Sequence, residues 1–250
     1  MDSAEITVNA AKIEFEKSFK EEKFYNKQTQ DDKHLDLLLS KMEISDGMKI
    51  LDLGTGSGYL AFAVAVMNPN VEVIGLDVVA ETLRRNESRA KSENLKNIKF
   101  RAYDGIEFMF DDGEFDCIIT RYALHHFPKI DMTFREMSRV LKDGGRLIIS
   151  DPTPNEDDAD KFVDEFMQMK PDGHIRFYSL SEFVELGEKA DLRFVSNQYT
   201  EIRFPRQNVS AYIPLLSQHD EHVIENYNIK IEGDEIYITE KILNIVFEKE

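Results

Sequence analysis

Three glycines at alternate positions and one preceding carboxylate form the part of the chain best suited to ligand chemistry. Gly54, Gly56 and Gly58 follow a short apolar run, and Asp52 lies two residues before the first of them. Glycine adopts backbone conformations that other residues avoid and lets a ligand approach the main chain. The apolar runs on both sides predict a strand, a tight turn and a helix. Doubly wound sheets bind nucleotide-like ligands at such turns.

The spacing of the glycines narrows the choice of ligand. A dinucleotide fingerprint reads G-x-G-x-x-G, whereas Gly54, Gly56 and Gly58 read G-x-G-x-G. No Lys-Ser or Lys-Thr pair follows them, which excludes a P-loop for phosphates. The negative charge of Asp52 suits a cation better than a pyrophosphate. On the turn alone, a dinucleotide enzyme remains an open alternative.

The sequence LDLGTGSG at residues 51–58 closely resembles the first motif of the class I S-adenosylmethionine-dependent methyltransferases. S-adenosylmethionine carries a sulfonium and an ammonium group and no phosphate, which agrees with the acidic residue before the glycines. The resemblance implies that the following residues bind the cofactor: Asp52, Gly54, Thr55, Gly56 and Gly58.

Two more acids follow the next two predicted strands. Asp77 ends the second strand, where an acid in a nucleoside-binding doubly wound sheet accepts both ribose hydroxyls. A capping role on the helix from about Ala80 is the structural alternative for Asp77. Asp104 follows the third strand, and the resemblance places it near the adenine amino group. Further cofactor contacts are expected at Val78, Gly105 and Ile106.

The segment after the fourth predicted strand contains candidates for catalysis. Residues 115–127 resemble small-molecule C- and O-methyltransferases related to ubiquinone and menaquinone biosynthesis. They lack the Asn/Asp-Pro-Pro-Tyr signature of amino-group methyltransferases acting on bases and glutamine. Arg121 is expected at the cofactor, and His125 or His126 is a candidate general base because histidine abstracts protons near neutral pH. Paired histidines at such a turn also commonly bond only backbone groups.

An irregular segment from Asp151 to about Tyr178 contains two more candidates, His174 and Arg176. In the resembling family this region caps the substrate cavity, so both side chains are predicted to contact the acceptor. An anionic acceptor would pair with Arg176 in a bidentate manner. The alternative is a loop held by its own side-chain hydrogen bonds.

The expected organisation is a single methyltransferase domain in three parts. Residues 1–45 are helical in composition, and the resemblance implies a lid in which Tyr25 covers the site; helices that simply pack on the core are the alternative. Residues 46–151 are predicted to bind the cofactor. Residues 152–250 are predicted to supply a substrate cap and the strands that complete the sheet.

Alternating strands and helices with short connections indicate an α/β fold with a doubly wound parallel sheet and right-handed crossovers. The resemblance implies a Rossmann-like methyltransferase sheet of seven strands, mostly parallel, with the last strand antiparallel. Later strands are predicted at 146–150, 194–199 and 236–247. Asp131 is expected to cap the helix after the fourth strand, and Ser179 to form a capping box with Glu182.

Composition limits the partners. The 48 acidic and 31 basic residues give a formal charge of −17, which argues against a nucleic-acid substrate. No apolar run reaches the ~18 residues of a membrane-spanning helix, and the single cysteine, Cys117, cannot form an intrachain disulfide. A cytoplasmic protein that does not contact membranes is therefore expected. No cluster of His, Cys, Asp and Glu has metal-site spacing, so no metal is expected.

The predicted function is transfer of a methyl group from S-adenosyl-L-methionine to an oxygen or carbon atom of a small molecule. Two alternatives remain open at this point: a nicotinamide-dependent oxidoreductase and a non-catalytic protein that binds S-adenosylmethionine. The acceptor and the oligomeric state are not predicted.

Overall fold

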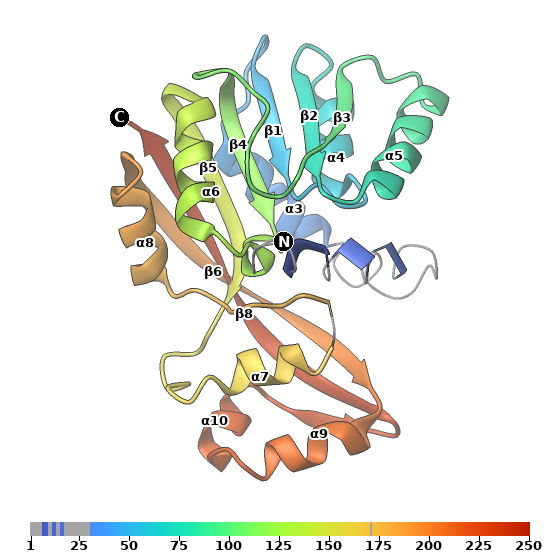
Figure 1. Cartoon of the computed structure of the whole chain (residues 1–250), viewed down its shortest axis with the longest axis vertical. Coiled ribbons are helices and arrows are strands. Elements are labelled where there is room, and N and C mark those ends of the chain that lie inside the picture. The colour runs from blue at the N-terminus through green and yellow to red at the C-terminus, as the bar shows by residue number, and fades with distance from the viewer. Residues whose placement is uncertain (1–6, 10–11, 14–15, 18–30, 171) are drawn as a thin grey trace.

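A twisted β-sheet runs through the molecule (Figure 1). The computed structural model describes residues 7–9, 12–13, 16–17, 31–170 and 172–250. Its strands are β1 (Lys49–Leu53), β2 (Glu72–Asp77), β3 (Ile98–Ala102), β4 (Phe115–Arg121), β5 (Leu141–Thr153), β6 (Leu192–Gln207), β7 (Lys230–Glu232) and β8 (Glu235–Lys249). They pair in the order β3-β2-β1-β4-β5-β8-β6, and β7 pairs with β8. The first five strands are parallel, and β8 is antiparallel to β5 and β6, which confirms the expected sheet.

Helices cover both faces of this sheet. They are α3 (Asp32–Met42), α4 (Tyr59–Met67), α5 (Ala80–Ser92), α6 (Ile130–Val140), α7 (Phe162–Gln168), α8 (Leu180–Glu188), α9 (Val209–Leu216), α10 (Glu221–Asn226) and the short 3-10 helix η1 (Leu124–His126). Because successive strand residues point to opposite faces, Ile50 of β1 joins the core under α3, α4 and α5. Its neighbour Leu51 joins the core under α6 and α8. Burial on both faces explains why the central strands are almost wholly apolar.

A second region, which we call the distal lobe, lies beyond the carboxyl end of β5. Pairing of β5 with β8 ends at Thr153 and Lys241, while β6 and β8 continue together to Gln207 and Glu235. This ribbon extends away from the main sheet, and α7, α9 and α10 gather around its end (Figure 1). The lobe has a core of its own, centred on the fully buried Tyr227.

The predicted strands in the C-terminal half were too short. β5 spans Leu141–Thr153 rather than 146–150, and β6 spans Leu192–Gln207 rather than 194–199. The prediction followed apolar runs, whereas β6 is half-exposed over most of its length and is held by a register of backbone pairs with β8. Such long-range pairing leaves little trace in the local sequence.

Helix ends were predicted with mixed success. The capping box of Ser179 and Glu182 at the start of α8 is confirmed. Asp131 as an N-cap was wrong, because α6 begins one residue earlier and Asp131 lies in its first turn. Most of the predicted lid, with Tyr25, lies outside the described residues, and α3 is the longest part of it that the structure describes. None of the helices formed by described residues is long and apolar enough to cross a membrane.

Candidate functional site

The glycine turn joins β1 to α4 at the carboxyl edge of the sheet. Gly54, Gly56 and Gly58 all have positive φ, at 72°, 49° and 78°, a region that favours glycine. A Cβ added at Gly54 would lie 2.6 Å from the Cβ of Ala123. The amides of Gly54 and Thr55 both donate to the carbonyl oxygen of Leu76, at 2.8 and 3.1 Å, and so fasten the turn to the end of β2. The turn therefore requires glycine and leaves open space beyond the strand ends.

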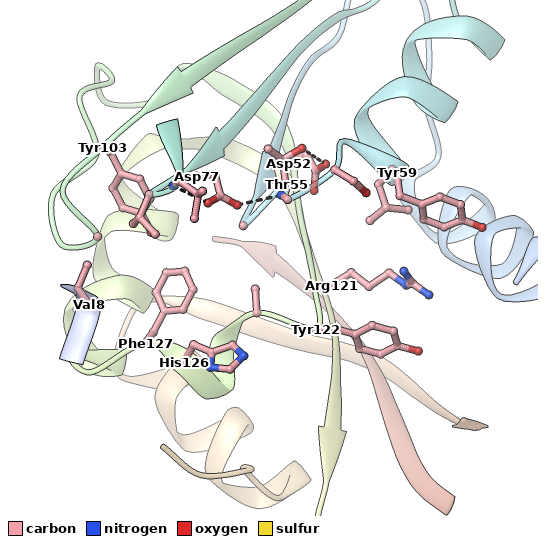
Figure 2. A pocket seen from close by; sticks show the side chains of 18 of the residues that line it. Val8, Asp52, Thr55, Tyr59, Asp77, Tyr103, Arg121, Tyr122, His126 and Phe127 are labelled. Atoms are coloured by element: carbon pink, nitrogen blue, oxygen red, sulfur yellow. Dashed lines mark hydrogen bonds between the residues drawn. The ribbon is translucent and has the colours of Figure 1, made fainter. Parts of the chain in front are cut away.

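That space is a cavity of about 180 Å³, here called the main cavity. In Figure 2, Asp52, Thr55 and Asp77 lie on one side of it, and His126 and Phe127 lie on the other. The lining residues come mainly from the turns after β1, β2, β3 and β4: Asp52, Gly54, Thr55, Gly56, Ser57, Tyr59, Leu60, Asp77, Val78, Val79, Tyr103, Gly105, Arg121, Tyr122, Ala123, His126, Phe127 and Pro128, with Val8 from the N-terminal part. The strand ends thus meet where doubly wound sheets bind ligands.

Asp52 is buried at the base of the turn. Its Oδ2 accepts hydrogen bonds from the Thr55 hydroxyl at 2.7 Å and from the Ala61 amide at 3.1 Å. Burial raises the pKa of Asp52 to about 6, and these two hydrogen bonds oppose the increase. The carboxylate is ionised above that pH and would attract a cationic group in the main cavity.

Asp77 lies at the end of β2, and each of its carboxylate oxygens accepts a hydrogen bond from a backbone amide. Its Oδ2 accepts from the Gly56 amide at 2.9 Å, and its Oδ1 accepts from the Val79 amide at 2.9 Å. The bond to Val79 resembles the predicted capping role, although the helix cap itself is Val79. Burial raises the pKa of Asp77, and the bonds to Val79 and Gly56 lower it. A carboxylate has about four lone-pair sites, so this oriented group can still accept hydrogen bonds from a ligand.

Arg121 and Tyr122 line the main cavity at the end of β4. The Arg121 guanidinium lies 4.2 Å from the centre of the Tyr122 ring. Tyr122 has a φ of 54°, in a region that costs energy for a bulky residue. Its amide donates to the carbonyl oxygen of Ser150 at 2.8 Å, which holds this strained backbone. His34 of α3 lies 3.5 Å from Arg121 and 3.4 Å from the Tyr122 hydroxyl through Nδ1, so α3 helps to position both residues.

The three predicted histidines lie together: His125 and His126 are in η1, and His174 packs beside them. The ring centres of His125 and His126 are 4.1 Å apart, and those of His125 and His174 are 5.4 Å apart. His125 Nδ1 is 3.0 Å from both carboxyl oxygens of Asp151, and His174 Nε2 is 2.8 Å from Asp164 Oδ1. Burial lowers the pKa of both His125 and His126 to about 3, so both rings are neutral near pH 7.

A smaller cavity of about 20 Å³, here called the second cavity, adjoins this cluster. His126 and Tyr122 line both cavities. The lining residues of the second cavity are Tyr122, His125, His126, Pro152, Met167, Asp172, His174, Phe177, Phe204, Arg206 and Glu240. The second cavity therefore lies between the main cavity and the distal lobe. Among the described residues, no group of three or more His, Cys, Asp or Glu side chains is arranged to hold a metal ion.

Some predicted site residues lie elsewhere. Arg176 lines neither cavity; it pairs with Glu182 and lies over the Tyr178 ring at 4.4 Å, so its predicted acceptor contact has no support from geometry. Asp104 is exposed, and its Oδ1 accepts from the amides of Ile106 and Glu107 at 2.8 and 3.0 Å. Neither Asp104 nor Ile106 lines the main cavity, because this turn directs the carboxylate to its own backbone. The adjacent Gly105 does line it.

Sequence reasoning missed several lining residues. Tyr103, Tyr122 and Phe127 are aromatic residues in connections, where periodicity carries no signal, and Tyr59 is the first residue of α4. Glu240 could have been found: it replaces an apolar residue in the alternating run Ile-Tyr-Ile-Thr-Glu-Lys-Ile at 236–242. The alternation predicts a buried side chain at this position, and acids are rarely buried without a partner. The acid therefore indicates a candidate functional residue.

Comparison with known proteins agrees with this geometry. A family model described as a methyltransferase domain matches residues 44–192. The uncharacterized methyltransferase YcgJ of Bacillus subtilis is 34% identical over 151 residues, which are 60% of this chain and 58% of that protein. A demethylmenaquinone methyltransferase of Staphylococcus carnosus is 33% identical over 145 residues, 57% of this chain and 55% of that protein. The chain thus spans less than two thirds of these relatives' length in sequence.

The solved structure of YcgJ extends the likeness to the distal lobe. The superposition has a TM-score of 0.76 at 27% sequence identity and covers 88% of this chain and 99% of the YcgJ chain. The sheet order, the glycine turn and the family match over more than half of the chain lead to one conclusion. The chain belongs to the class I S-adenosylmethionine-dependent methyltransferases, related to YcgJ and to the menaquinone-biosynthesis methyltransferases.

Proposed function

We propose that this protein methylates a small-molecule acceptor, at an oxygen or carbon atom, with S-adenosylmethionine bound in the main cavity. The observation that carries the proposal is that the two cavities are adjacent and share two lining residues, His126 and Tyr122. One cavity has the carboxylates of Asp52 and Asp77, and the other reaches toward the distal lobe. A relative named for demethylmenaquinone supports a small-molecule acceptor.

The residues of the main cavity fit the cofactor. Asp77 would accept the ribose hydroxyls with the lone pairs that Gly56 and Val79 leave available. Asp52 lies beneath the turn, where its negative charge favours a cationic ligand. The apolar side chains of Val78, Tyr103 and Phe127 offer a surface for an aromatic base.

Catalysis would depend mainly on alignment. When bound, the cofactor supplies an electrophilic methyl group on a sulfonium. Alignment of two reactants can lower a barrier by ~7–11 kcal/mol, and Tyr122 and His126 lie where the acceptor would meet the cofactor. With a pKa lowered by burial to about 3, His126 is a weak base near pH 7, so its proposed role is to position the acceptor rather than to take its proton. His125 bonds Asp151 and lines only the second cavity, so its expected role is to position His126.

A thermal-shift panel tests the proposal. S-adenosylmethionine and S-adenosylhomocysteine should raise the unfolding temperature, because a ligand that binds only the native state stabilises it by mass action. NAD(H) should leave it unchanged. A screen with a radioactive methyl group would then test transfer to small molecules. Stabilisation by NAD(H) alone, or methylation of nucleic acid only, would refute the proposed function.

A further inference from the structure

One face of β8 carries two buried polar residues in an otherwise apolar row. Successive strand residues alternate between faces, so Ile236, Ile238, Glu240, Ile242 and Asn244 share a face, and all are buried. Glu240 is 2% exposed and Asn244 is fully buried. Their surroundings differ in a way that separates a structural role from a ligand-binding role.

Asn244 has partners for both ends of its amide. Its Oδ1 accepts from the Ser150 hydroxyl at 2.9 Å and lies 2.9 Å from His34 Nε2. Its Nδ2 donates to the Gln198 carbonyl and the Thr200 hydroxyl, each at 3.1 Å. A buried polar group that is satisfied in this way fixes the fold around it. Asn244 therefore joins α3, β5 and β6 to β8.

The surroundings of Glu240 are different. Its Oε1 is buried and has no hydrogen-bond partner among the described residues, and the side chain lines the second cavity. Burial raises the pKa of Glu240 to about 8. Burial of a carboxyl group without a partner is costly. Because burial of Glu240 does not stabilise the fold, its position is better explained by a ligand that bonds the carboxyl group.

Arg206 on β6 faces the same cavity. The register pairs Arg206 with Ile236, which places its side chain on the face that Glu240 shares. Its Nε is buried without a hydrogen-bond partner in the described part of the chain. The remaining guanidinium nitrogens donate to Met167 Sδ at 3.1 Å and to the Pro205 carbonyl at 3.3 Å, and the group lies 5.5 Å from the centre of the Phe204 ring. No ion pair within 4.0 Å joins Arg206 to Glu240 among the described residues. The other acid of this cavity, Asp172, already accepts from the His174 amide and pairs with Lys170, so Glu240 and Arg206 are the acidic and basic groups left for a ligand.

We infer that Glu240 and Arg206 bind the polar end of the methyl acceptor, which carries a hydrogen-bond donor next to a hydrogen-bond acceptor. A 2-hydroxy acid or a 2-amino acid has this arrangement. The hydroxyl or ammonium group would donate to Glu240 Oε1, and the carboxylate would accept from Arg206. This inference rests on the proposed function, because it assigns the acceptor of the same site.

The remaining walls define the rest of the acceptor. Around the two charged groups lie Met167, Phe177 and Phe204, which suit an apolar molecule. The second cavity, at about 20 Å³, is little larger than the space for one water molecule. Only the hydrogen-bonding atoms of the polar end would therefore enter it. The body of the acceptor would therefore extend past Tyr122 and His126 into the main cavity, toward the cofactor.

A matched set of probes tests this assignment. The full chain, saturated with S-adenosylhomocysteine, is titrated calorimetrically with 3-phenyllactate and phenylalanine, which carry both groups. The probe 3-phenylpropionate lacks the donor, and 2-phenylethanol lacks the carboxylate. A compound with both groups should bind at least tenfold more tightly than either analogue. Glu240→Gln and Arg206→Gln should each remove at least tenfold of that affinity, with unchanged affinity for S-adenosylhomocysteine.

The control is Glu201→Gln, which changes an exposed acid on the neighbouring strand and should bind like the natural protein. Should Glu240→Gln fail to fold, the half-buried Arg206 still supplies the test. Equal affinity for 3-phenylpropionate, unchanged affinity in the folded variants, or no binding of any probe would overturn the inference. The proposed function fails by a different result, the absence of S-adenosylhomocysteine binding by the natural protein.

Discussion

In the main cavity the buried carboxylates of Asp52 and Asp77 already accept hydrogen bonds, whereas in the second cavity Glu240 Oε1 and Arg206 Nε have none among the described residues. The first pair is oriented by the fold before any ligand binds, and such preorganisation favours affinity. The second pair lowers the stability of the fold, and in the proposed complex a ligand supplies its hydrogen bonds. Changes at the main cavity should therefore affect binding, and changes at the second should also affect stability.

The largest expected effect concerns the turn itself. Gly54 and Gly144 both have a φ of 72°, so alanine at either position carries a similar backbone cost of roughly 1–2 kcal/mol. Only at Gly54 would the new Cβ meet a neighbour, at 2.6 Å from Ala123, while Gly144 has nothing within 4 Å. Gly54→Ala should weaken S-adenosylhomocysteine binding by roughly a hundredfold or more, a loss of about 2.7 kcal/mol. Gly144→Ala should bind normally.

Calorimetry on both variants, with circular dichroism to confirm folding, would check this contrast. Equal affinities for the two variants would show that the close approach at Gly54 has no part in the cofactor site.

The next effect compares two acids at neighbouring strand ends. Asp77→Asn should weaken S-adenosylhomocysteine binding by roughly tenfold to a hundredfold, because hydrogen bonds to a charged acceptor contribute about 1.5–3 kcal/mol. Asp104→Asn should have little effect, since Asp104 is exposed and bonds its own turn. Dissociation constants from calorimetry are the measurement. A larger loss for Asp104→Asn would restore the adenine contact predicted from the family resemblance.

The smallest expected effect is on stability and changes with pH. A folded pKa of about 8 for Glu240 is raised from 4.5 by burial. Folding therefore favours the protonated form of Glu240. The stability that this protonation contributes to the fold is fully present below pH 4.5 and is lost as the pH rises through 8. The groups that influence or surround this carboxyl are Arg206, Asp151 and Asp172, with His125, His126 and His174 on the cavity wall.

Glu240→Gln cannot ionise, so it should be more stable than the natural protein by roughly 1–3 kcal/mol at pH 8. The two should differ much less at pH 5. Thermal unfolding across this range is the measurement, with Glu201→Gln as the exposed control. Parallel stability curves for Glu240→Gln and the natural protein would contradict the burial of an ionisable, unpartnered carboxyl.

Much of the lining of the main cavity could be predicted from the sequence because its signals are local. A strand, its turn and the acid at its end are adjacent in the chain. Asp52, Gly54 and Asp77 could therefore be named as candidates without long-range information, and all three line the main cavity. Asp104 shows the limit of such reasoning. It follows a strand as expected. Whether its carboxylate faces a ligand or accepts from its own backbone depends on the conformation of the turn.

The distal lobe could not be predicted in the same way. Glu240 and Arg206 approach each other only because β6 and β8 pair along their full lengths. His174 and Arg176 were both predicted to contact the acceptor, but only His174 lines the second cavity, whereas Arg176, two residues away, pairs with Glu182. Neighbours in an irregular segment share no fixed periodicity, so the sequence carries no rule for which of them faces inward.

The continuous ribbon of β6 and β8 has an evolutionary consequence. The chain leaves the main sheet on β6, builds α9, α10 and β7, and returns on β8 (Figure 1). One hairpin therefore supplies Arg206 and Glu240 without contributing to the glycine turn. If the hairpin binds the acceptor as proposed, its mutation or exchange would change which acceptor is selected and leave the cofactor site unchanged. New substrate ranges could then arise by divergence of one contiguous stretch of sequence.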